Sequence, residues 1–206
     1  MTGSDHYFTA RPASAADRRT IVVELSGRTV EVETAAGIFS PGHVDLGSRV
    51  LLRTVPPPPP TGELLDLGCG WGPLALTMAA ASPAARVWAV DVNERALDLV
   101  RRNAARLGLT NVVAATPDEV PAGLAFAAVW SNPPIRVGKE ALHALLLRWL
   151  GQLVPGGEGW LVVGRHLGAD PLQHWLTESL AGRADVGRAA SAKGFRVLRV
   201  AADAGS

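Results

Sequence analysis

The tetrapeptide Asn132-Pro133-Pro134-Ile135 follows an apolar run, residues 126–130, and carries the most specific chemistry in the chain. The two prolines fix the torsion φ and have no N–H groups, so the turn is rigid and its carbonyl oxygens face outward as acceptors. If the Asn132 side-chain oxygen and the Pro133 carbonyl both accept from one –NH₂ group, they orient its lone pair for in-line attack and stabilise the positive charge that develops. The tetrapeptide therefore predicts a site for a planar exocyclic amine, with Asn132, Pro133 and Pro134 as catalytic residues.

A glycine-rich loop upstream of this turn predicts what is bound beside the amine. The segment Asp66-Leu67-Gly68-Cys69-Gly70-Trp71-Gly72 ends a predicted buried strand, residues 63–67, and precedes a predicted helix, residues 73–81, with proline in its first turn. Bare glycine backbone lets a ligand approach closely, and the free N–H groups of the helix face it. The spacing Gly-x-Gly-x-Gly differs from that of nicotinamide and flavin sites, and no Gly-Lys-Ser/Thr follows. We therefore expect S-adenosylmethionine as cofactor, bound by Asp66, Gly68, Cys69, Gly70 and Gly72.

The next predicted strand, residues 86–90, ends at Asp91. A carboxylate at such a strand end can accept two hydrogen bonds from a ribose diol, as in dinucleotide-binding folds. Asp91, with Val92 beside it, is therefore the candidate for the ribose of the cofactor.

Strands and helices alternate along the rest of the chain, which is typical of a parallel α/β sheet. After the proline run we expect strands at 63–67, 86–90, 111–115, 126–131, 160–164 and 195–200, helices at 73–81, 93–107, 139–150 and 171–180, and a turn at 154–159. Before it, alternation around Ser26-Gly27 predicts a β-hairpin, and Asp45 is the predicted N-cap of a helix over 45–54. The expected domains are an extension at 1–55, a polyproline II spacer at 56–60 and a core at 61–206, together one globular unit.

Several of these segments together resemble the class I S-adenosylmethionine-dependent methyltransferases, and within them the small-domain group related to 16S ribosomal RNA guanine-N2 methyltransferases. The chain looks most like the stand-alone members, which lack the extra domain of the two-domain enzymes. The residues that carry the resemblance are Gly37-Ile38-Phe39-Ser40, Asp45-Leu46-Gly47-Ser48 and residues 66–72, 90–93, 131–139 and 193–198.

The resemblance implies a Rossmann-like, seven-stranded methyltransferase sheet with helices on both faces and an antiparallel final strand, plus a small N-terminal hairpin and helix extension. It implies guanine N2 of ribosomal RNA as the methyl acceptor and places Phe39 and Ser40 near the methionine end of the cofactor. Many relatives have an acid near the adenine after the third strand, where this chain has Thr116 and then Asp118.

Substrate contacts are expected from Phe39, Ile135, Arg136 and Lys139. Many relatives have an aromatic residue where this chain has Ile135, which can press on a base but offers no π face. Adenine N6 and the side-chain amide of a protein glutamine are also planar –NH₂ groups, so the residues leave the acceptor open. A non-catalytic RNA-binding or assembly module with the same fold is another alternative, against which stand the intact Asp91 and Asn132.

The composition indicates a small enzyme without a strong overall electrostatic field. The chain has 206 residues, 48% hydrophobic, and a formal net charge of +1 from 20 basic and 19 acidic side chains. RNA binding would therefore need a local basic patch. The candidates are Arg101, Arg102 and Arg106, for which a solvated helix face is the better interpretation, then Arg136 and Lys139 beside the predicted turn, and Lys193, Arg196 and Arg199 near the C-terminus.

The remaining sequence features predict neither a metal nor a membrane. Cys69 is the single cysteine, and the five histidines have no paired spacing of the kind that binds zinc. The polar segment Met1 to His6 does not resemble a signal peptide, and no apolar run reaches membrane-spanning length. We therefore expect a cytoplasmic protein; the sequence leaves its oligomeric state open.

Overall fold

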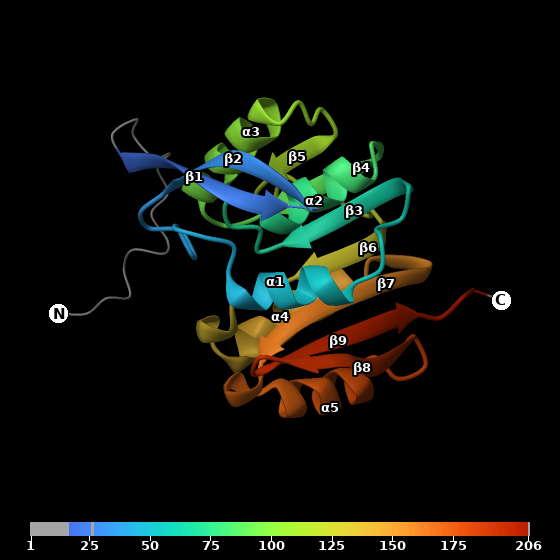
Figure 1. Cartoon of the computed structure of the whole chain (residues 1–206). Coiled ribbons are helices and arrows are strands. Elements are labelled where there is room, and N and C mark those ends of the chain that lie inside the picture. Colours follow the sequence, from blue (N-terminus) through green and yellow to red (C-terminus); the bar gives the residue numbers. More distant parts are fainter. Residues whose placement is uncertain (1–16, 26, 206) are drawn as a thin grey trace.

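The computed structural model, which describes residues 17–25 and 27–205, has a seven-stranded sheet and a separate two-stranded hairpin (Figure 1). The strand order of the large sheet is β5-β4-β3-β6-β7-β9-β8. All neighbouring pairs are parallel except those of β9, which is antiparallel to both β7 and β8. The expectation of a seven-stranded α/β sheet with an antiparallel last strand is confirmed. The strands are β3 (Thr61–Leu67), β4 (Ala84–Val90), β5 (Val112–Ala115), β6 (Phe126–Ser131), β7 (Leu153–Gly164), β8 (Ala184–Ala192) and β9 (Phe195–Ala202).

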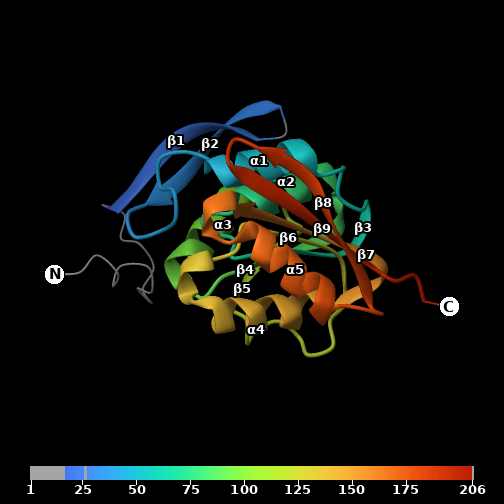
Figure 2. The ribbon, with the colours of Figure 1, turned by 90° about the horizontal axis from the view of Figure 1, so that it is seen from below.

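Helices cover both faces of this sheet, as expected. The helices α1 (Leu46–Thr54), α2 (Pro73–Ala81) and α3 (Glu94–Arg106) bury their apolar side chains against one face. The helices α4 (Lys139–Leu150) and α5 (Ala169–Ser179) pack on the other. Figure 2 shows α1 and α2 above the sheet and α4 below it. None of the helices in the described residues is long and apolar enough to cross a membrane.

The predicted hairpin consists of β1 (Arg18–Leu25) and β2 (Arg28–Ala35). Its buried side chains, among them Val32, pack on α2 and α3. The buried Asn103 side chain of α3 reinforces this contact, because its Oδ1 accepts from Glu33 N (2.6 Å) and its Nδ2 donates to Glu33 O (3.0 Å) and Trp71 O (3.2 Å). Residues 1–16 of the predicted extension, Met1 to His6 among them, and Ser26 of the predicted turn lie outside the described residues.

Two elements differ from the sequence-based expectation. Residues 154–159, predicted as a turn, lie within β7, where the pairing with β6 shifts register and Gly156 has φ +75°. The strand β8 was not predicted, because its sequence, ADVGRAASA, consists largely of residues with low strand propensity. It forms through its pairing with β9. The proline segment 56–60 connects α1 to β3 without helix or strand.

Candidate active site

The glycine loop and the Asn-Pro-Pro turn follow neighbouring strands at the centre of the sheet. Leu67 of β3 is in register with Ser131 of β6, so Gly68 and Asn132 leave the sheet side by side. The Ser131 hydroxyl donates to Leu67 O (2.7 Å) and ties the two strand ends together. Strands β4 and β5 lie on one side of β3, and β6 and β7 lie on the other. Open α/β sheets bind ligands at such a reversal of strand order, outside the carboxyl ends of the strands.

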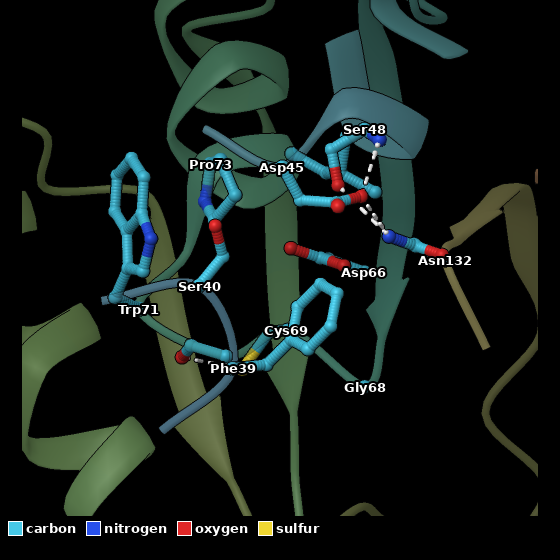
Figure 3. Close-up of a pocket in the computed structure, with 12 residues that line it drawn as sticks. Phe39, Ser40, Asp45, Ser48, Asp66, Gly68, Cys69, Trp71, Pro73 and Asn132 are labelled. Atoms are coloured by element: carbon cyan, nitrogen blue, oxygen red, sulfur yellow. Dashed lines mark hydrogen bonds between the residues drawn. The ribbon is translucent and has the colours of Figure 1, made fainter. Parts of the chain in front are cut away.

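A pocket of about 350 Å³, including the solvent at its mouth, lies at this edge (Figure 3). Seven of its lining residues were predicted for the site: Phe39, Ser40, Asp66, Gly68, Cys69, Gly70 and Asn132. Five more were not predicted to line it: Asp45, Ser48, Trp71, Pro73 and Leu74. The two segments with predicted chemistry, the glycine-rich loop and the Asn-Pro-Pro turn, therefore line one cavity.

The glycine loop is held by backbone bonds and by glycine torsions. Gly68 N and Cys69 N both donate to Val90 O (2.8 and 3.1 Å), which fixes the loop to the end of β4. Gly72 has φ +97° and is the N-cap of α2, and a Cβ there would lie 3.1 Å from Val100 Cγ2. Gly72 therefore shapes the loop without lining the pocket.

Asp66 is a buried carboxyl group with one unused oxygen. Its Oδ2 accepts from Ala75 N in the first turn of α2 (2.8 Å), while its buried Oδ1 has no hydrogen-bond partner. Burial raises the pKa of Asp66 to about 8; the Ala75 N–H bond opposes this rise, and the charge of Asp91 adds to it. The pocket thus contains a desolvated carboxyl oxygen without a partner, which is an acceptor when the group is ionised.

Asp91 lies behind the glycine loop. Its Oδ2 accepts from Gly70 N (3.0 Å) and its Oδ1 from Asn93 N (2.9 Å), so the carboxylate braces the loop against the end of β4. Burial raises the pKa of Asp91, and these backbone N–H groups oppose the rise. Asp91 does not line the pocket. Its ribose role stays a prediction.

The other residues predicted for the cofactor side also lie outside the pocket lining. Val92, beside Asp91, is 62% exposed. Thr116 follows β5, and both its N–H and its hydroxyl donate to Glu119 Oε2 (2.7 and 3.1 Å). The donors of Thr116 are therefore already engaged, and Asp118 beside them is exposed.

The Asn132 amide is held in one orientation. Its Nδ2 donates to Asp45 Oδ2 (2.7 Å) and to Ser48 Oγ (3.2 Å). A carboxylate can only accept, so the NH₂ end of the amide faces Asp45 and its Oδ1 faces away (Figure 3). A Cβ built on Gly68 would lie 3.7 Å from Pro134 Cδ, so the turn lies against the glycine loop.

The Pro133 carbonyl differs from the prediction. It was expected to be a free acceptor, but it accepts from Ile135 N (2.8 Å) across Pro134, whose torsions of −75° and 76° describe an inverse γ-turn. One of its two lone pairs is therefore engaged and one is available. The Pro133 side chain is buried, and half-buried Ile135 packs against the core. Sequence patterns alone could not show this bond, because it depends on the torsion ψ of Pro134.

The exposed side chains beside the turn are cationic. Arg136 and Lys139 are exposed, and neither pairs with a carboxylate within residues 17–25 and 27–205. Neither lines the pocket. Their role in substrate binding stays a prediction.

Two further features bear on the chemistry of the pocket. Cys69 is buried, and burial raises the pKa of its thiol well above the ordinary value, so it is a protonated loop residue. Within the part of the chain that the structure describes, no group of three or more His, Cys, Asp or Glu side chains could hold a metal ion.

Comparison with known proteins shows the family of the chain. The family model described as methyltransferase small domain matches residues 29–199. An uncharacterized protein of Bacillus subtilis, YbxB, is 35% identical over 169 residues, which are 81% of this chain and 84% of that protein. The ribosomal RNA small subunit methyltransferase C of Stutzerimonas stutzeri is 34% identical over 197 residues, 92% of this chain and 56% of that protein.

A solved structure extends the comparison to three dimensions. The 16S rRNA N2 methyltransferase of T. thermophilus, in complex with AdoMet and guanosine, superposes with a TM-score of 0.76 at 24% identity, over 93% of this chain and 52% of that one. At this identity the superposition shows the fold. The chain spans about half the length of these ribosomal RNA methyltransferases. With its family model covering residues 29–199, the chain belongs to the methyltransferase small domain family.

Proposed function

We propose that this chain is an S-adenosylmethionine-dependent methyltransferase that methylates an exocyclic amine, the N2 group of guanine in ribosomal RNA. The observation that carries the proposal is the fixed Asn132 amide: Asn132 lines the same pocket as the glycine loop, and its Oδ1 is turned away from Asp45. An acceptor in this position suits a substrate group that donates hydrogen bonds. The names of the relatives, ribosomal RNA small subunit methyltransferase C, support the same substrate.

The residues around the glycine loop fit the cofactor. The unpartnered Asp66 Oδ1 would accept from the α-ammonium of the methionine moiety, which would satisfy an otherwise orphaned buried oxygen. The bare backbone at Gly68 and Gly70 would let the methionine chain lie close. Asp91 would accept from the ribose hydroxyls with its remaining lone pairs, and Val92 and Thr116 would lie on the adenine side. When bound, S-adenosylmethionine supplies an electrophilic methyl group on a sulfonium.

The turn at the end of β6 would orient the amine. Asn132 Oδ1 and the free lone pair of the Pro133 carbonyl would each accept one N–H of the –NH₂ group, which directs the nitrogen lone pair toward the cofactor side of the pocket. As positive charge develops on the nitrogen, both acceptors bind it more strongly. Once methylated, the nitrogen would be strongly acidic and would release one proton to water, so no strong general base is required. Pro134 holds the turn rigid.

The mouth of the pocket offers surfaces for a base. Phe39 lines the pocket and exposes half of its side chain, so its ring would provide the aromatic face that Ile135 lacks. Ile135 would press on the base from the turn. Arg136 and Lys139 would contact phosphates beside it.

A second depression supports an RNA strand as the substrate. A basic groove of about 200 Å³ is lined by Leu46, Arg49, Val50, Arg53 and Lys193. Its three cationic side chains are exposed and form no ion pair with any other described residue. Helix α1, which supplies four of these residues, begins next to Asp45 and Asn132. Because ribosomal RNA and the cofactor are cytoplasmic, we also propose a cytoplasmic location.

Product analysis tests the acceptor. The protein would be incubated with tritiated S-adenosylmethionine and, separately, with 16S RNA, 23S RNA, transfer RNA and ribosomal subunits, and labelled RNA would be digested to nucleosides. We expect label in N2-methylguanosine. Label in N6-methyladenosine or in glutamine of a ribosomal protein would replace the proposed acceptor with one of the alternatives. Cofactor binding without transfer to any of these would favour a non-catalytic module.

An Asn132→Ala variant tests the catalytic turn. We expect kcat to fall by about 10²- to 10³-fold, as when one preorganised transition-state contact is removed. The affinity for S-adenosylhomocysteine, measured by calorimetry, should stay within a few-fold of the wild-type value, because the glycine loop is unchanged. Wild-type turnover in this variant would remove the proposed role of Asn132.

A further inference from the structure

One carboxylate oxygen joins the start of helix α1 to the catalytic turn. Asp45 Oδ2 accepts from Ser48 N (3.1 Å), which caps the helix, and also from Asn132 Nδ2 (2.7 Å), 87 residues away in the sequence. Ser48 Oγ, on a buried side chain, is the second acceptor for the same Nδ2 (3.2 Å). The amide nitrogen of Asn132 is therefore bound twice by residues of one helix terminus.

The backbone leaves room for this arrangement at Gly47. A Cβ on Gly47 would lie 2.9 Å from Asp45 Oδ2, 3.0 Å from Phe195 Cε1 and 3.4 Å from Asn132 Nδ2. The first distance is shorter than real Cβ atoms show, and the second is tighter than most real Cβ contacts, so a side chain at Gly47 would push Asp45 or Phe195 away. The close approach of the α1 terminus to the turn depends on this glycine.

The contact fixes which end of the Asn132 amide faces Asp45 and Ser48, and so which end is left for a ligand. The terminal torsion of asparagine is broad and roughly two-fold, so an unrestrained amide could present either its oxygen or its NH₂ group. An amine substrate needs the oxygen, because an NH₂ group in its place would point hydrogens at hydrogens. A flipped amide would also place its oxygen against the Asp45 carboxylate, where two acceptors repel.

We propose that Asp45 is a positioning residue for the methyl transfer: it holds the Asn132 amide with Oδ1 toward the substrate and so selects acceptors that carry an –NH₂ group. Ser48 assists it as a second acceptor. This inference rests on the proposed function and deepens it, because it assigns the selection of an amine to a residue outside the Asn-Pro-Pro turn.

Two substitutions at the same position separate capping from positioning. Serine is a good N-cap, so Asp45→Ser keeps the bond to Ser48 N, but its hydroxyl is too short to reach Asn132 as well. Asparagine also caps, and in Asp45→Asn the side-chain oxygen can take the place of Oδ2 for both donors. We expect kcat to fall by about 10- to 100-fold in Asp45→Ser, at an unchanged melting temperature, and Asp45→Asn to recover most of that loss. Equal kcat in Asp45→Ser and the wild type would overturn the proposal.

A double-mutant cycle shows whether Asp45 acts through Asn132. In an Asn132→Ala background, Asp45→Ser should lower kcat no further, since the side chain that it orients is gone. If Asp45→Ser lowers kcat by the same factor in both backgrounds, Asp45 acts by another route and the proposal is wrong. The KM for the cofactor should not change in either background.

A measurement without substrate keeps this proposal separate from the proposed function. In the ¹H–¹⁵N spectrum, the Asn132 side-chain NH₂ pair is identified by its absence in Asn132→Ala. In Asp45→Ser this NH₂ group loses its shorter bond and keeps only the one to Ser48 Oγ, so its shifts should move toward those of a free amide and its hydrogen exchange should accelerate at least tenfold. An unchanged pair would refute the positioning role whatever the substrate is. A changed pair in a protein that methylates no amine would leave the contact standing and refute the proposed function.

Discussion

Asp66 is a pocket residue with a strongly raised pKa. Its pKa of about 8 means that at neutral pH the buried carboxyl group is largely protonated, while the proposed ammonium ligand requires the ionised form. Cofactor binding would therefore release a proton from Asp66 near pH 7. A bound ammonium group would offset the desolvation cost of the ionised Asp66 carboxylate.

Burying the ionised Asp66 carboxylate lowers the stability of the folded protein. The Asp66→Asn variant should therefore gain stability over the wild type as the pH rises. Between the ordinary aspartate pKa of 3.8, which holds in the unfolded chain, and the folded-state pKa of about 8, the native protein binds a proton that the unfolded chain has lost. Wild-type stability therefore falls as pH rises through this window, whereas asparagine does not titrate. We expect the free energy of unfolding of Asp66→Asn, relative to the wild type, to rise by about 2 to 3 kcal/mol from pH 6 to pH 9 in urea titrations.

The cofactor provides the complementary measurement for Asp66. The affinity of the wild type for S-adenosylhomocysteine should rise with pH between pH 6 and 7.5, by up to about tenfold per unit, as Asp66 ionises. Asp66→Asn should bind weakly and without this slope. A stability difference that does not vary with pH would mean that the carboxyl group is not desolvated as described.

Residue types and spacing were enough to predict the lining of the pocket at Asp66, Gly68, Cys69, Gly70 and Asn132, because each lies in a short segment with its own local chemistry. The partner of Asn132 was not predictable in this way. Asp45 could be recognised as a helix cap from its neighbours, but its bond to Asn132 joins two segments through tertiary packing. The Pro133 bond depends on a backbone torsion that composition does not encode.

At the scale of elements, the hairpin is fixed to the core through α3. The Asn103 side chain forms hydrogen bonds with three backbone groups, and Arg106 of the same helix forms ion pairs with Glu31 and Glu33. Arg101 and Arg102 pair with acids of α3 itself. These pairs agree with a solvated helix face for this group. Because Asn103 also holds Trp71 O, the hairpin and the pocket wall share one anchor.

An Asn103→Leu variant tests this anchor. The substitution keeps the branched shape and the number of side-chain heavy atoms but leaves buried backbone groups of Glu33 and Trp71 unpaired, so we expect a loss of about 2 to 4 kcal/mol in urea unfolding. Hydrogen exchange at the amide of Glu33 should accelerate before that of β3. Asn111, whose Nδ2 bonds three carbonyls at the end of α2 and around β4, is the matched control, since Asn111→Leu should destabilise without selective exposure of Glu33. Retained protection at Glu33 in Asn103→Leu would contradict the anchor.

Local patterns predicted the helices better than the strands. Both α2 and α4 occupy the predicted residues, because proline in the first turn of α2 and an amphipathic repeat in α4 define them locally. The strand β8 and the first half of β7 were missed, since glycine and alanine carry little strand preference and only pairing with neighbours makes them strands.

At the scale of the whole molecule, a net charge of +1 conceals an uneven distribution. Arg196 and Arg199, predicted as RNA candidates, pair with Asp170 and Glu158, whereas Lys193 lies with Arg49 and Arg53 in the basic groove. A field from such a local group acts within about 8 to 10 Å at physiological salt. RNA would therefore be held close to α1.

An Arg49→Glu, Arg53→Glu double variant tests the groove. We expect the KM for RNA to rise by about tenfold or more, and the slope of log K against log salt to fall by about two, one for each lost phosphate contact. Affinity for S-adenosylhomocysteine should not change. Arg183→Glu is the matched control, because Arg183 precedes β8, whereas Lys193 of the groove follows the other end of that strand. If the double variant and Arg183→Glu change the KM for RNA equally, the effect is a nonspecific one of charge, and the groove is not the RNA-binding site.

The shared oxygen of Asp45 couples the local stability of one helix to the reaction. If the first turn of α1 opens, Asp45 and Ser48 leave together and the Asn132 amide is free to rotate, although the sheet and the glycine loop remain folded. Local openings of this kind require less free energy than global unfolding. On warming, catalysis should therefore fail before the protein melts, so that the loss of enzymatic rate reports the opening of a single helical turn.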